Sequence, residues 1–544
     1  MNRKTMKKGM VCTLVMVMLL TLLSGCSLGK ATDTNEGGDK KLQIGVVARG
    51  YGDEYLKKLA EAFTKKTGIE TVLAKSTYDP GAMNSQVVAG PKHNQLDVIF
   101  DINAAAFASL AKVNYVEGYE RAFATLNDVY DSVAEGYGTD KTIKELFFPY
   151  ALNACTWGGD EAGFGDGNQY FISYATSLEG LIYNVDLFEK YNLSEPKTTN
   201  EFFALMDQMK RLGGGTYPKN EEGYAIYPYV FSGQVNYTSF LSTVWWAQYD
   251  GVDNFNRALE GKDAKGVYTA NSLKSPGKLS AFNLTSKLLA ANSGYWNLNN
   301  FSASFTNTQL AFLDKQAFMM SSGEWIEREM ENNFAGESMN IAFMRIPVNS
   351  DIVQKCDSVT DEEKLVETIA YIDGDTNVRP SYLSDADLTR ISEARSVYNS
   401  EGNQHIAYIP AYSNMVEEAK EFLKFFLSKE GQEIMSEYSY GNTAPLNVDV
   451  TSFKTYESMS VLQKSKYNML TSQTGLTLVG NNYYHPMAYV GGVRAFYNTP
   501  TMETAFGTIE TSDSYKTPLE LWEAEYNMMK ASWERAMKNA GVSN

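Results

Sequence analysis

The side chains that could do chemistry in this chain are mostly carboxylates and aromatic rings. The sequence holds 65 Asp and Glu, 7 Trp, 35 Tyr and 27 Phe, but only 4 Cys and 3 His. The nucleophile motif G-x-S-x-G, the zinc motif H-E-x-x-H, a P-loop and a strand-linked G-x-G-x-x-G are all absent. No two histidines stand at ligand spacing, which disfavours metal capture. The residue types therefore favour two kinds of interaction, which are stacking on aromatic rings and hydrogen bonding to carboxylates.

Cys26 is the cysteine that follows a processing signal. A basic head in residues 3–8 precedes the uncharged apolar run Met10–Leu23, which is shorter than the roughly 20 residues of a permanent membrane helix. Leu23-Ser24-Gly25-Cys26 resembles the lipobox of bacterial lipoproteins, where the cysteine sulfur receives a diacylglyceryl group. We expect a signal peptide at 1–25, a lipidated Cys26, a flexible tether at 26–40 and a place on the extracytoplasmic face of the cell membrane. The alternative is an ordinary cysteine beside an ordinary cleavage site.

Charge and length narrow the class of protein further. Removing residues 1–25 takes away four basic and no acidic residues, so the net charge of −17 becomes −21. Such a chain repels nucleic acid and anionic lipid. The remaining length exceeds what one hydrophobic core usually supports, so two lobes are expected. After processing, only Cys155 and Cys356 accompany the lipid site; we expect free thiols, with a single bridge as the alternative.

The chain alternates strands and helices from its first folded residues. Leu42–Ala48 predicts a buried strand, and residues 53–68 place an apolar face at helical spacing before Gly68. Residues 69–73 and 97–100 predict two more strands, with Asp101 ending the last. Parallel strands bind ligands beyond their carboxyl ends, so the 49–52 loop and Asp101 are expected at one rim.

Residues 181–215 carry the most informative pattern. A short strand at 181–183 leads into a helix near Asp186, and a turn with Pro196 follows. Thr198 and Glu201 have the spacing of a capping box for the next helix, which Gly213–Gly215 ends.

This stretch, LIYNVDLFEKYNLSEPKTTNEFF, resembles the YNKDLF…PKTWDEF signature of family 1 of the extracellular solute-binding proteins, the carbohydrate-binding lipoproteins of ABC importers. Three other segments agree in order: EYLKKLAEAFTKKTGIE near the start, DKQAFMMSSGEWIERE from Asp314, and residues 417–445. The resemblance implies an α/β, two-lobed periplasmic-binding-protein-like fold (type II) with a ligand cleft and a hinge. By analogy one lobe holds 41–148 and 347–443, and the other holds 149–346 and 444–544. The polar region 350–404 departs from the family pattern and is expected to be a surface insertion.

Pyranose rings offer apolar faces that stack on aromatic side chains, and hydroxyls that need fixed partners. The resemblance implies Trp325, after a strand-to-helix turn, as a cleft residue, with local packing as the alternative. It also implies Trp245 as a stacking ring, in preference to its neighbour Trp246. Tyr237 is a further candidate, with core packing equally open.

Three more residues complete the expected site. Tyr51 follows the first strand and could stack from the opposite lobe, although a solvated turn residue is as plausible. Asp101 stands where the family commonly places an acid that accepts sugar hydroxyls, and a helix N-cap is the alternative. Tyr484 lies in NNYYHPMAYVGG, which matches the family's late cleft segment.

The resemblance implies a binding protein without cofactor or metal. It would act as a monomer that captures a carbohydrate, an oligosaccharide, and passes it to the membrane permease of an ABC importer. Two alternatives stay open. One is a lipid-anchored glycoside hydrolase, because the acidic composition supplies enough carboxylates for a catalytic pair. The other is the same fold holding a non-sugar solute such as a peptide or a polyamine.

Overall fold

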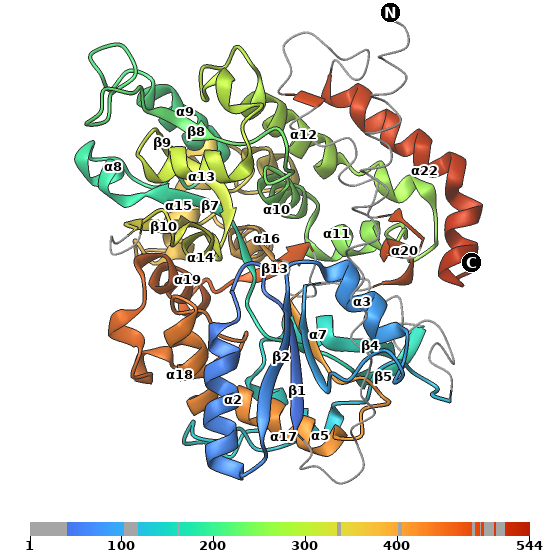
Figure 1. Cartoon of the computed structure of the whole chain (residues 1–544). Coiled ribbons are helices and arrows are strands. Elements are labelled where there is room, and N and C mark those ends of the chain that lie inside the picture. Colours follow the sequence, from blue (N-terminus) through green and yellow to red (C-terminus); the bar gives the residue numbers. More distant parts are fainter. Residues whose placement is uncertain are drawn as a thin grey trace, which may run out of the picture. The chain divides into compact units, whose positions relative to one another are not determined.

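The strands lie in two main sheets, each assembled from segments that are distant in the sequence (Figure 1). The computed structural model describes residues 41–102, 118–159, 164–334, 339–400, 405–480, 485–489, 491–493, 505–506 and 517–544. Leu42–Asn544 forms one compact unit. The expected signal peptide, the tether and Cys26 lie outside the described residues.

The first sheet has the strand order β2-β1-β3-β12-β6. β1 pairs in parallel with β2 and β3, as the sequence predicts, whereas β12 runs antiparallel to both β3 and β6. Its strands are β1 (Leu42–Val47), β2 (Thr71–Thr77), β3 (Val98–Asp101), β6 (Ile172–Ser173) and β12 (Ile406–Tyr408).

Helix α2 (Glu54–Thr67) confirms the periodicity read from the sequence. Leu56, Leu59, Ala60 and Phe63 are all buried, and Gly68 caps the helix in the left-handed conformation at φ 78°. The buried residues around this sheet form the first core. The helices that contribute to it are α2, α3 (Pro80–Val88), α5 (Asn127–Tyr130), α6 (Ile143–Leu146), α7 (Pro149–Cys155), α17 (Val416–Leu427) and α18 (Lys429–Tyr438).

The second sheet has the order β13-β11-β7-β9-β8, and β10 also pairs with β7. Its strands are β7 (Leu178–Asn184), β8 (Tyr227–Val230), β9 (Ala317–Gly323), β10 (Ile341–Met344), β11 (Val397–Ser400) and β13 (Thr477–Gly480). A small separate ribbon pairs β4 (Thr156–Gly159) with β5 (Phe164–Gln169).

A second core surrounds this sheet. The helices that contribute to it are α8 (Val185–Lys190), α9 (Thr199–Met209), α10 (Ser239–Asp250), α11 (Val252–Leu259), α12 (Pro276–Leu289), α13 (Phe305–Leu313), α14 (Ile326–Met330), α19 (Val461–Thr471) and α22 (Pro518–Ala540). At α9, the Thr198 side chain accepts a hydrogen bond from the Glu201 backbone N–H. The Glu201 carboxylate reaches back to the N–H of Lys197, one residue before the N-cap, so only half of the predicted capping box forms.

The region predicted to be a surface insertion has a core of its own. A 3-10 helix (Ser350–Lys355), α15 (Glu362–Asp373) and α16 (Asp385–Ser396) enclose Ile352, Leu365, Ile369 and Ile391, which are fully buried. This group of helices packs on α10, and β11 then joins the second sheet.

The chain changes sheets at positions that differ from the expected lobe limits. Residues 149–159 and 164–173 pack with the first sheet, because α7 and β6 bury Ala151, Cys155 and Ile172 in the first core. The strand at 397–400 belongs to the second sheet. The expected lobe limits, as limits of moving parts, stay a prediction.

Two of the crossing segments lie side by side. The Tyr174 N–H donates to the carbonyl of His405 at 3.0 Å. The Ser400 hydroxyl donates to the carbonyl of Thr176 at 2.8 Å. The first crossing and its return are therefore hydrogen-bonded to each other.

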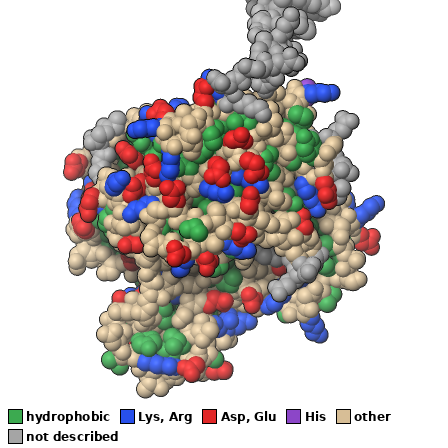
Figure 2. All heavy atoms as spheres, turned by 90° about the horizontal axis from the view of Figure 1, so that it is seen from below, with side chains coloured by type: hydrophobic (Ala, Val, Ile, Leu, Met, Phe, Trp, Pro, Cys, Tyr) green, Lys and Arg blue, Asp and Glu red, His purple; other side chains and the backbone are tan. Residues whose placement is uncertain are grey.

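The structure bears on the membrane-spanning character, the cysteines and the surface charge of the described residues. Among the described residues, no helix combines the length and the apolar character needed to cross a membrane. Cys155 and Cys356 are free thiols, and burial raises the pKa of each to about 12. Figure 2 shows acidic and basic side chains interspersed on one face, so the net charge of −17 is not gathered into a single patch there.

Candidate binding cleft

A hollow of about 650 Å³ lies between loops that leave the first sheet and residues attached to the second. This volume is within the range of ordinary ligand pockets. The first sheet contributes Ala48, Arg49, Gly50, Gly52, Tyr78, Ile102 and His405; the second side contributes Tyr237, Phe305, Thr306, Trp325, Arg328, Glu329, Met330, Glu331 and Asn332. The 49–52 loop of the predicted rim therefore borders this hollow, whereas Asp101 is not among the lining residues.

Trp325 lines this hollow and also packs into the first core. It stands at the N-terminus of α14, and its ring lies 5.7 Å from the ring of His405. A Cβ at Gly323 would meet the Trp325 ring at 2.5 Å, so that glycine makes room for it. Only 6% of the residue is exposed. Both predicted roles, packing and cleft lining, are thus compatible with its position.

Tyr237 also lines the hollow. Its ring stacks on Phe240 at 4.8 Å and meets Phe305, another lining residue, edge-on at 5.6 Å. The residue is half-buried, so one part of the ring is held by neighbours while another borders the cavity.

Tyr51 does not present its ring to the hollow. The residue is 1% exposed, and its hydroxyl donates to the Glu324 carboxylate at 2.6 Å. Its ring packs edge-on against Tyr174 and His405. The strand-end position was correct, but the side chain turns inward because a buried acceptor from the second side takes its hydroxyl. The neighbouring Gly50 and Gly52 line the hollow instead.

Glu324 is the centre of a buried polar network beneath the hollow. Besides Tyr51, its carboxylate accepts from the Ser177 N–H at 2.9 Å and from the Lys466 ammonium at 3.0 Å. Glu324 and Lys466 are both completely buried. Desolvation lowers the pKa of Lys466 despite this partner. The network joins the loop after β1 to β9 and α19, and so ties the two sheets together.

Ser177 extends the same network toward the crossing segments. It adopts a positive φ of 52°, which is uncommon for a residue with a side chain. Its hydroxyl lies 2.7 Å from Nδ1 of His405. Hydrogen bonds of the Ser177 main chain with Glu324 and of its side chain with His405 therefore stabilise this unfavourable backbone conformation.

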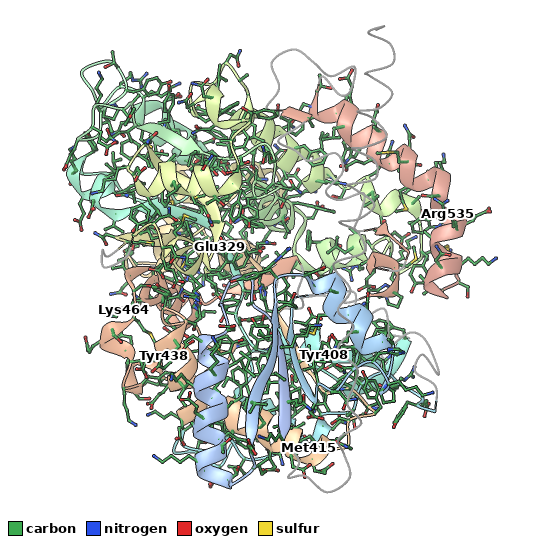
Figure 3. The ribbon with its side chains drawn as sticks, viewed as in Figure 1. Glu329, Tyr408, Met415, Tyr438, Lys464 and Arg535 are labelled. Carbon is green, nitrogen blue, oxygen red and sulfur yellow. The ribbon has the colours of Figure 1, made fainter. Side chains whose placement is uncertain are left out.

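Asp101 lies inside the first sheet and not on the wall of the hollow. It is completely buried, accepts a hydrogen bond from the Tyr408 hydroxyl at 2.9 Å, and accepts another from the Ile102 N–H at 2.8 Å. Burial raises the pKa of Asp101 to about 7. Figure 3 shows Tyr408 at the level of these strands and Glu329 above them. The next residue, Ile102, is the one that borders the hollow.

Trp245 belongs to the second core. It is completely buried in α10, and its indole N–H donates to the carbonyl of Pro347 at 3.2 Å. α10 is buried on every face, which is typical of a helix that is apolar all round. The run SFLSTVWWA carries that signal, and it favours core packing over ligand contact. Trp246 is also buried.

Tyr484 lies outside the described residues. Its neighbour His485 is buried, and its Nδ1 accepts from the Met487 N–H at 3.1 Å. Burial lowers the pKa of His485 to about 4.

The hollow also contains charged residues that the sequence reasoning did not single out. Arg328 forms an ion pair with Glu331, whose carboxylate also accepts from the Tyr440 hydroxyl at 3.0 Å. Glu329 accepts from the Gln309 side chain at 2.9 Å, and burial raises its pKa to about 7. The signal was present in the sequence, because these residues directly follow the SSGEW turn.

Tyr78, Phe305 and His405 were missed as well. Tyr78 follows β2 and is 70% exposed, so the strand-end rule that selected Tyr51 applies equally to it. The hollow therefore combines exposed and half-buried rings with carboxylate, guanidinium and amide groups. Among the described residues no cluster of three side chains could hold a metal ion.

Several solved structures share this fold at low sequence identity. The solute-binding protein RafE in complex with raffinose gives a TM-score of 0.55 at 16% identity, covering 90% of this chain and 100% of that one. Apo RafE from Streptococcus pneumoniae gives 0.54 at 13%, covering 91% and 100%. The bacterial solute receptor AcbH, described as preferring β-D-galactopyranose exclusively, gives 0.55 at 13%, covering 91% and 99%.

A further structure comes from work on xylan utilization by Caldanaerobius polysaccharolyticus. It gives a TM-score of 0.57 at 13% identity, covering 90% of this chain and 100% of that one. These likenesses confirm the predicted α/β fold of two-lobed solute-binding proteins. No curated protein sequence matches the chain.

The family of bacterial extracellular solute-binding proteins matches residues 58–461. That span covers most of the chain and includes both sheets except β1 and β13. Its members are binding proteins and not enzymes. The chain therefore belongs to the bacterial extracellular solute-binding proteins.

Proposed function

We propose that this protein captures a carbohydrate, an oligosaccharide, in the hollow between its two sheets and delivers it to the permease of an ABC importer. The observation that carries the proposal is the set of aromatic rings on opposite sides of one cavity. Tyr78 comes from the first side, and Tyr237, Phe305 and Trp325 come from the second. Rings placed this way can stack on both faces of a pyranose.

The polar groups of the hollow suit the rest of a sugar. Arg49, Arg328 and Asn332 offer N–H donors, and Glu329 offers a carboxylate acceptor. A sugar hydroxyl both donates and accepts, so walls that carry both kinds of group can bind it from either side. Raffinose, galactopyranose and xylan, named for structures of the same fold, support this ligand class.

The switch that we infer is closure of the two lobes on the sugar. A ligand that touches both sides stabilises the closed state, and only that difference in affinity can shift the population. We infer that Cys26 carries the lipid that keeps the loaded protein near its permease, and that the protein acts as a monomer without catalytic activity.

Calorimetric titration of the full chain, purified in detergent, tests the proposal. The panel contains mono- and oligosaccharides, including raffinose, galactose and xylo-oligosaccharides, together with peptides and polyamines, and product analysis follows on the sugar samples. Saturable binding with intact sugar is expected. Cleavage of a sugar would favour the glycoside hydrolase, and binding of peptides or polyamines alone would favour the other alternative.

A matched pair of variants locates the site. Tyr78→Ala removes an exposed ring from the hollow and is expected to weaken binding about two- to tenfold, which is the worth of one stacking contact. Tyr224→Ala removes a ring that is 56% exposed and does not line the hollow. Trp325→Ala is expected to weaken binding by at least as much as Tyr78→Ala. Equal affinities of the two tyrosine variants would refute this location.

A further inference from the structure

A second hollow, of about 420 Å³, lies on the side of α10 that faces the inserted helices. Its walls come from α10, α11, the segment that leads into α12, and the insertion at 350–404, which contributes Lys355 and Arg390. Nothing about the sugar cleft involves these residues. The sequence predicts that residues 350–404 are an insertion, so a feature built partly by them calls for a separate explanation.

The walls of this hollow are basic although the chain is acidic. Five cations line it: Arg257, Lys262, Lys274, Lys355 and Arg390. The lining acids are Asp250 and Asp263, so the lining carries a net charge of +3 in a chain whose net charge is −17. A positive hollow on an acidic protein concentrates small anions locally.

The two lining acids are already occupied by other donors. Asp250 accepts from the Trp246 indole at 2.9 Å and from the Gly277 N–H at 3.0 Å. Asp263 accepts from the N–H groups of Lys265 and Val267. Among the described residues neither carboxylate forms an ion pair with a lining cation, and both negative charges are already included in the net charge of +3.

Most of the cations also lack an acidic partner. Lys262 pairs with Glu260 at 2.7 Å. Within the part of the chain that the structure describes, Arg257, Lys274, Lys355 and Arg390 form no ion pair. Lys274 and Lys355 lie over aromatic rings, at 4.4 Å from the Tyr526 centroid and 5.1 Å from that of Tyr249.

Unused hydrogen-bond donors accompany this charge. The Nε atoms of Arg257 and Arg390 are buried without a partner, and so is the hydroxyl of Ser272, a lining residue that is 8% exposed. Buried polar groups are rarely left unpaired. Two arginines lie in the lining of this hollow, and guanidinium groups are well suited to the acceptor oxygens of a phosphate group.

We propose that this hollow binds a small phosphate-bearing solute, either free phosphate or a phosphomonoester. Lys355 and Arg390 would then complete an anion site at the C-terminal end of α10, and none of its lining residues lines the sugar cleft. The phosphate of an anionic lipid headgroup offers related chemistry, so the test must separate that source.

The test titrates inorganic phosphate into the full chain at constant ionic strength, with calorimetric detection. Saturable binding at one site is expected, and the Arg257→Gln/Arg390→Gln double variant is expected to weaken it at least about tenfold. Lys265→Gln is the matched control, because Lys265 is an exposed cation of the same region that does not line the hollow.

A second variant keeps the test valid in case the arginine variant does not fold. Arg390 also donates to the carbonyl of Tyr249, so its loss could disturb the fold. Lys274→Gln/Lys355→Gln removes two exposed charges that make no hydrogen bond among the described residues, and it is expected to weaken binding as well. No saturation by about 10 mM phosphate, or wild-type affinity in both double variants, would overturn the proposal.

Calorimetric titration with the soluble headgroups glycerophosphoglycerol and glycerophosphocholine distinguishes the lipid source, because a chain lipidated at Cys26 would sediment with any vesicle. We expect neither headgroup to bind in a way that depends on Arg257 and Arg390. If glycerophosphoglycerol binding depends on these arginines while free phosphate does not bind, the proposed solute is wrong and a lipid headgroup takes its place.

Discussion

Replacing Glu324 by Gln tests whether the buried network beneath the cleft holds the two sheets together. The carboxylate accepts three hydrogen bonds, from Tyr51, Ser177 and Lys466. A glutamine side chain can still accept through its oxygen, but its amide group turns two N–H donors toward an ammonium that also only donates. The change therefore removes the partner of a fully buried charge.

The expected loss follows from that geometry. Both members of the Glu324–Lys466 pair are completely buried, and removing one partner of such a pair typically costs about 3–5 kcal/mol. Removing one partner of a solvent-exposed ion pair lowers the unfolding free energy by less than about 1 kcal/mol. The loss of unfolding free energy in Glu324→Gln should become smaller as the pH rises toward the ordinary pKa of lysine. Desolvation already lowers the pKa of Lys466 in the folded chain, so the unfolded chain binds more protons there.

Urea unfolding of the full chain at neutral pH measures this loss. Glu331→Gln is the matched control, because that carboxylate pairs with Arg328 at side chains that are about a quarter exposed. The double variant Glu324→Gln/Lys466→Met should recover part of the loss, since it removes the unpaired charge as well. A Glu324→Gln loss no larger than that of Glu331→Gln, or no recovery in the double variant, would refute the reasoning.

Three further outcomes are expected. Burial raises the pKa of Asp101 to about 7, so its contribution to stability is complete below its ordinary pKa and is lost as the pH rises through about 7. Between the ordinary pKa of an aspartate and about pH 7, the unfolding free energy should fall less steeply with pH in Asp101→Asn than in the wild type. The difference in slope should be up to about 1.4 kcal/mol per pH unit, and equal slopes in urea unfolding at several pH values would contradict this. Because Glu329 has a pKa of about 7 in the cleft, affinity for a hydroxyl-donating sugar should rise about tenfold from about pH 6 to about pH 8, and calorimetry of Glu329→Gln should show a flat profile. Gly52 and Gly68 both have positive φ, but only a Cβ at Gly52 would meet Arg328, at 2.5 Å. Gly52→Ala should therefore lower the unfolding temperature more than Gly68→Ala, each carrying a backbone cost of about 1 kcal/mol, and equal shifts would exclude the contact.

The sequence predicted well those features that depend on local pattern. The apolar face and the glycine cap of α2, the parallel pairing of β1 with its neighbours and the start of α9 at Thr198 all follow from spacing within a few residues. The family resemblance added the two-lobed fold. Local signals also pointed to the loop after β1 and to the SSGEW turn, which both supply residues that line the hollow.

Features that depend on distant partners were harder to predict. Tyr51 stands at the predicted rim, but its direction is set by Glu324, which lies 273 positions further along the chain. Trp245 resembles a stacking ring in the sequence, yet its burial depends on Pro347 and on the sheet beneath α10. The positions where the chain changes sheets depend on which core receives each apolar residue. A segment such as α7 does not carry that information by itself.

The hydrogen bonds between the two crossing segments near Tyr174 and His405 have a mechanical consequence. Two separate tethers would allow the halves of the protein to rock and to twist independently. Segments joined at Tyr174–His405 and at Ser400–Thr176 form a narrow ribbon instead, which bends more readily across its face than within its plane. We therefore expect closure of the two sides, the movement proposed above, to follow mainly one rotation axis. A ligand that pulls on any part of either wall would then drive the same movement.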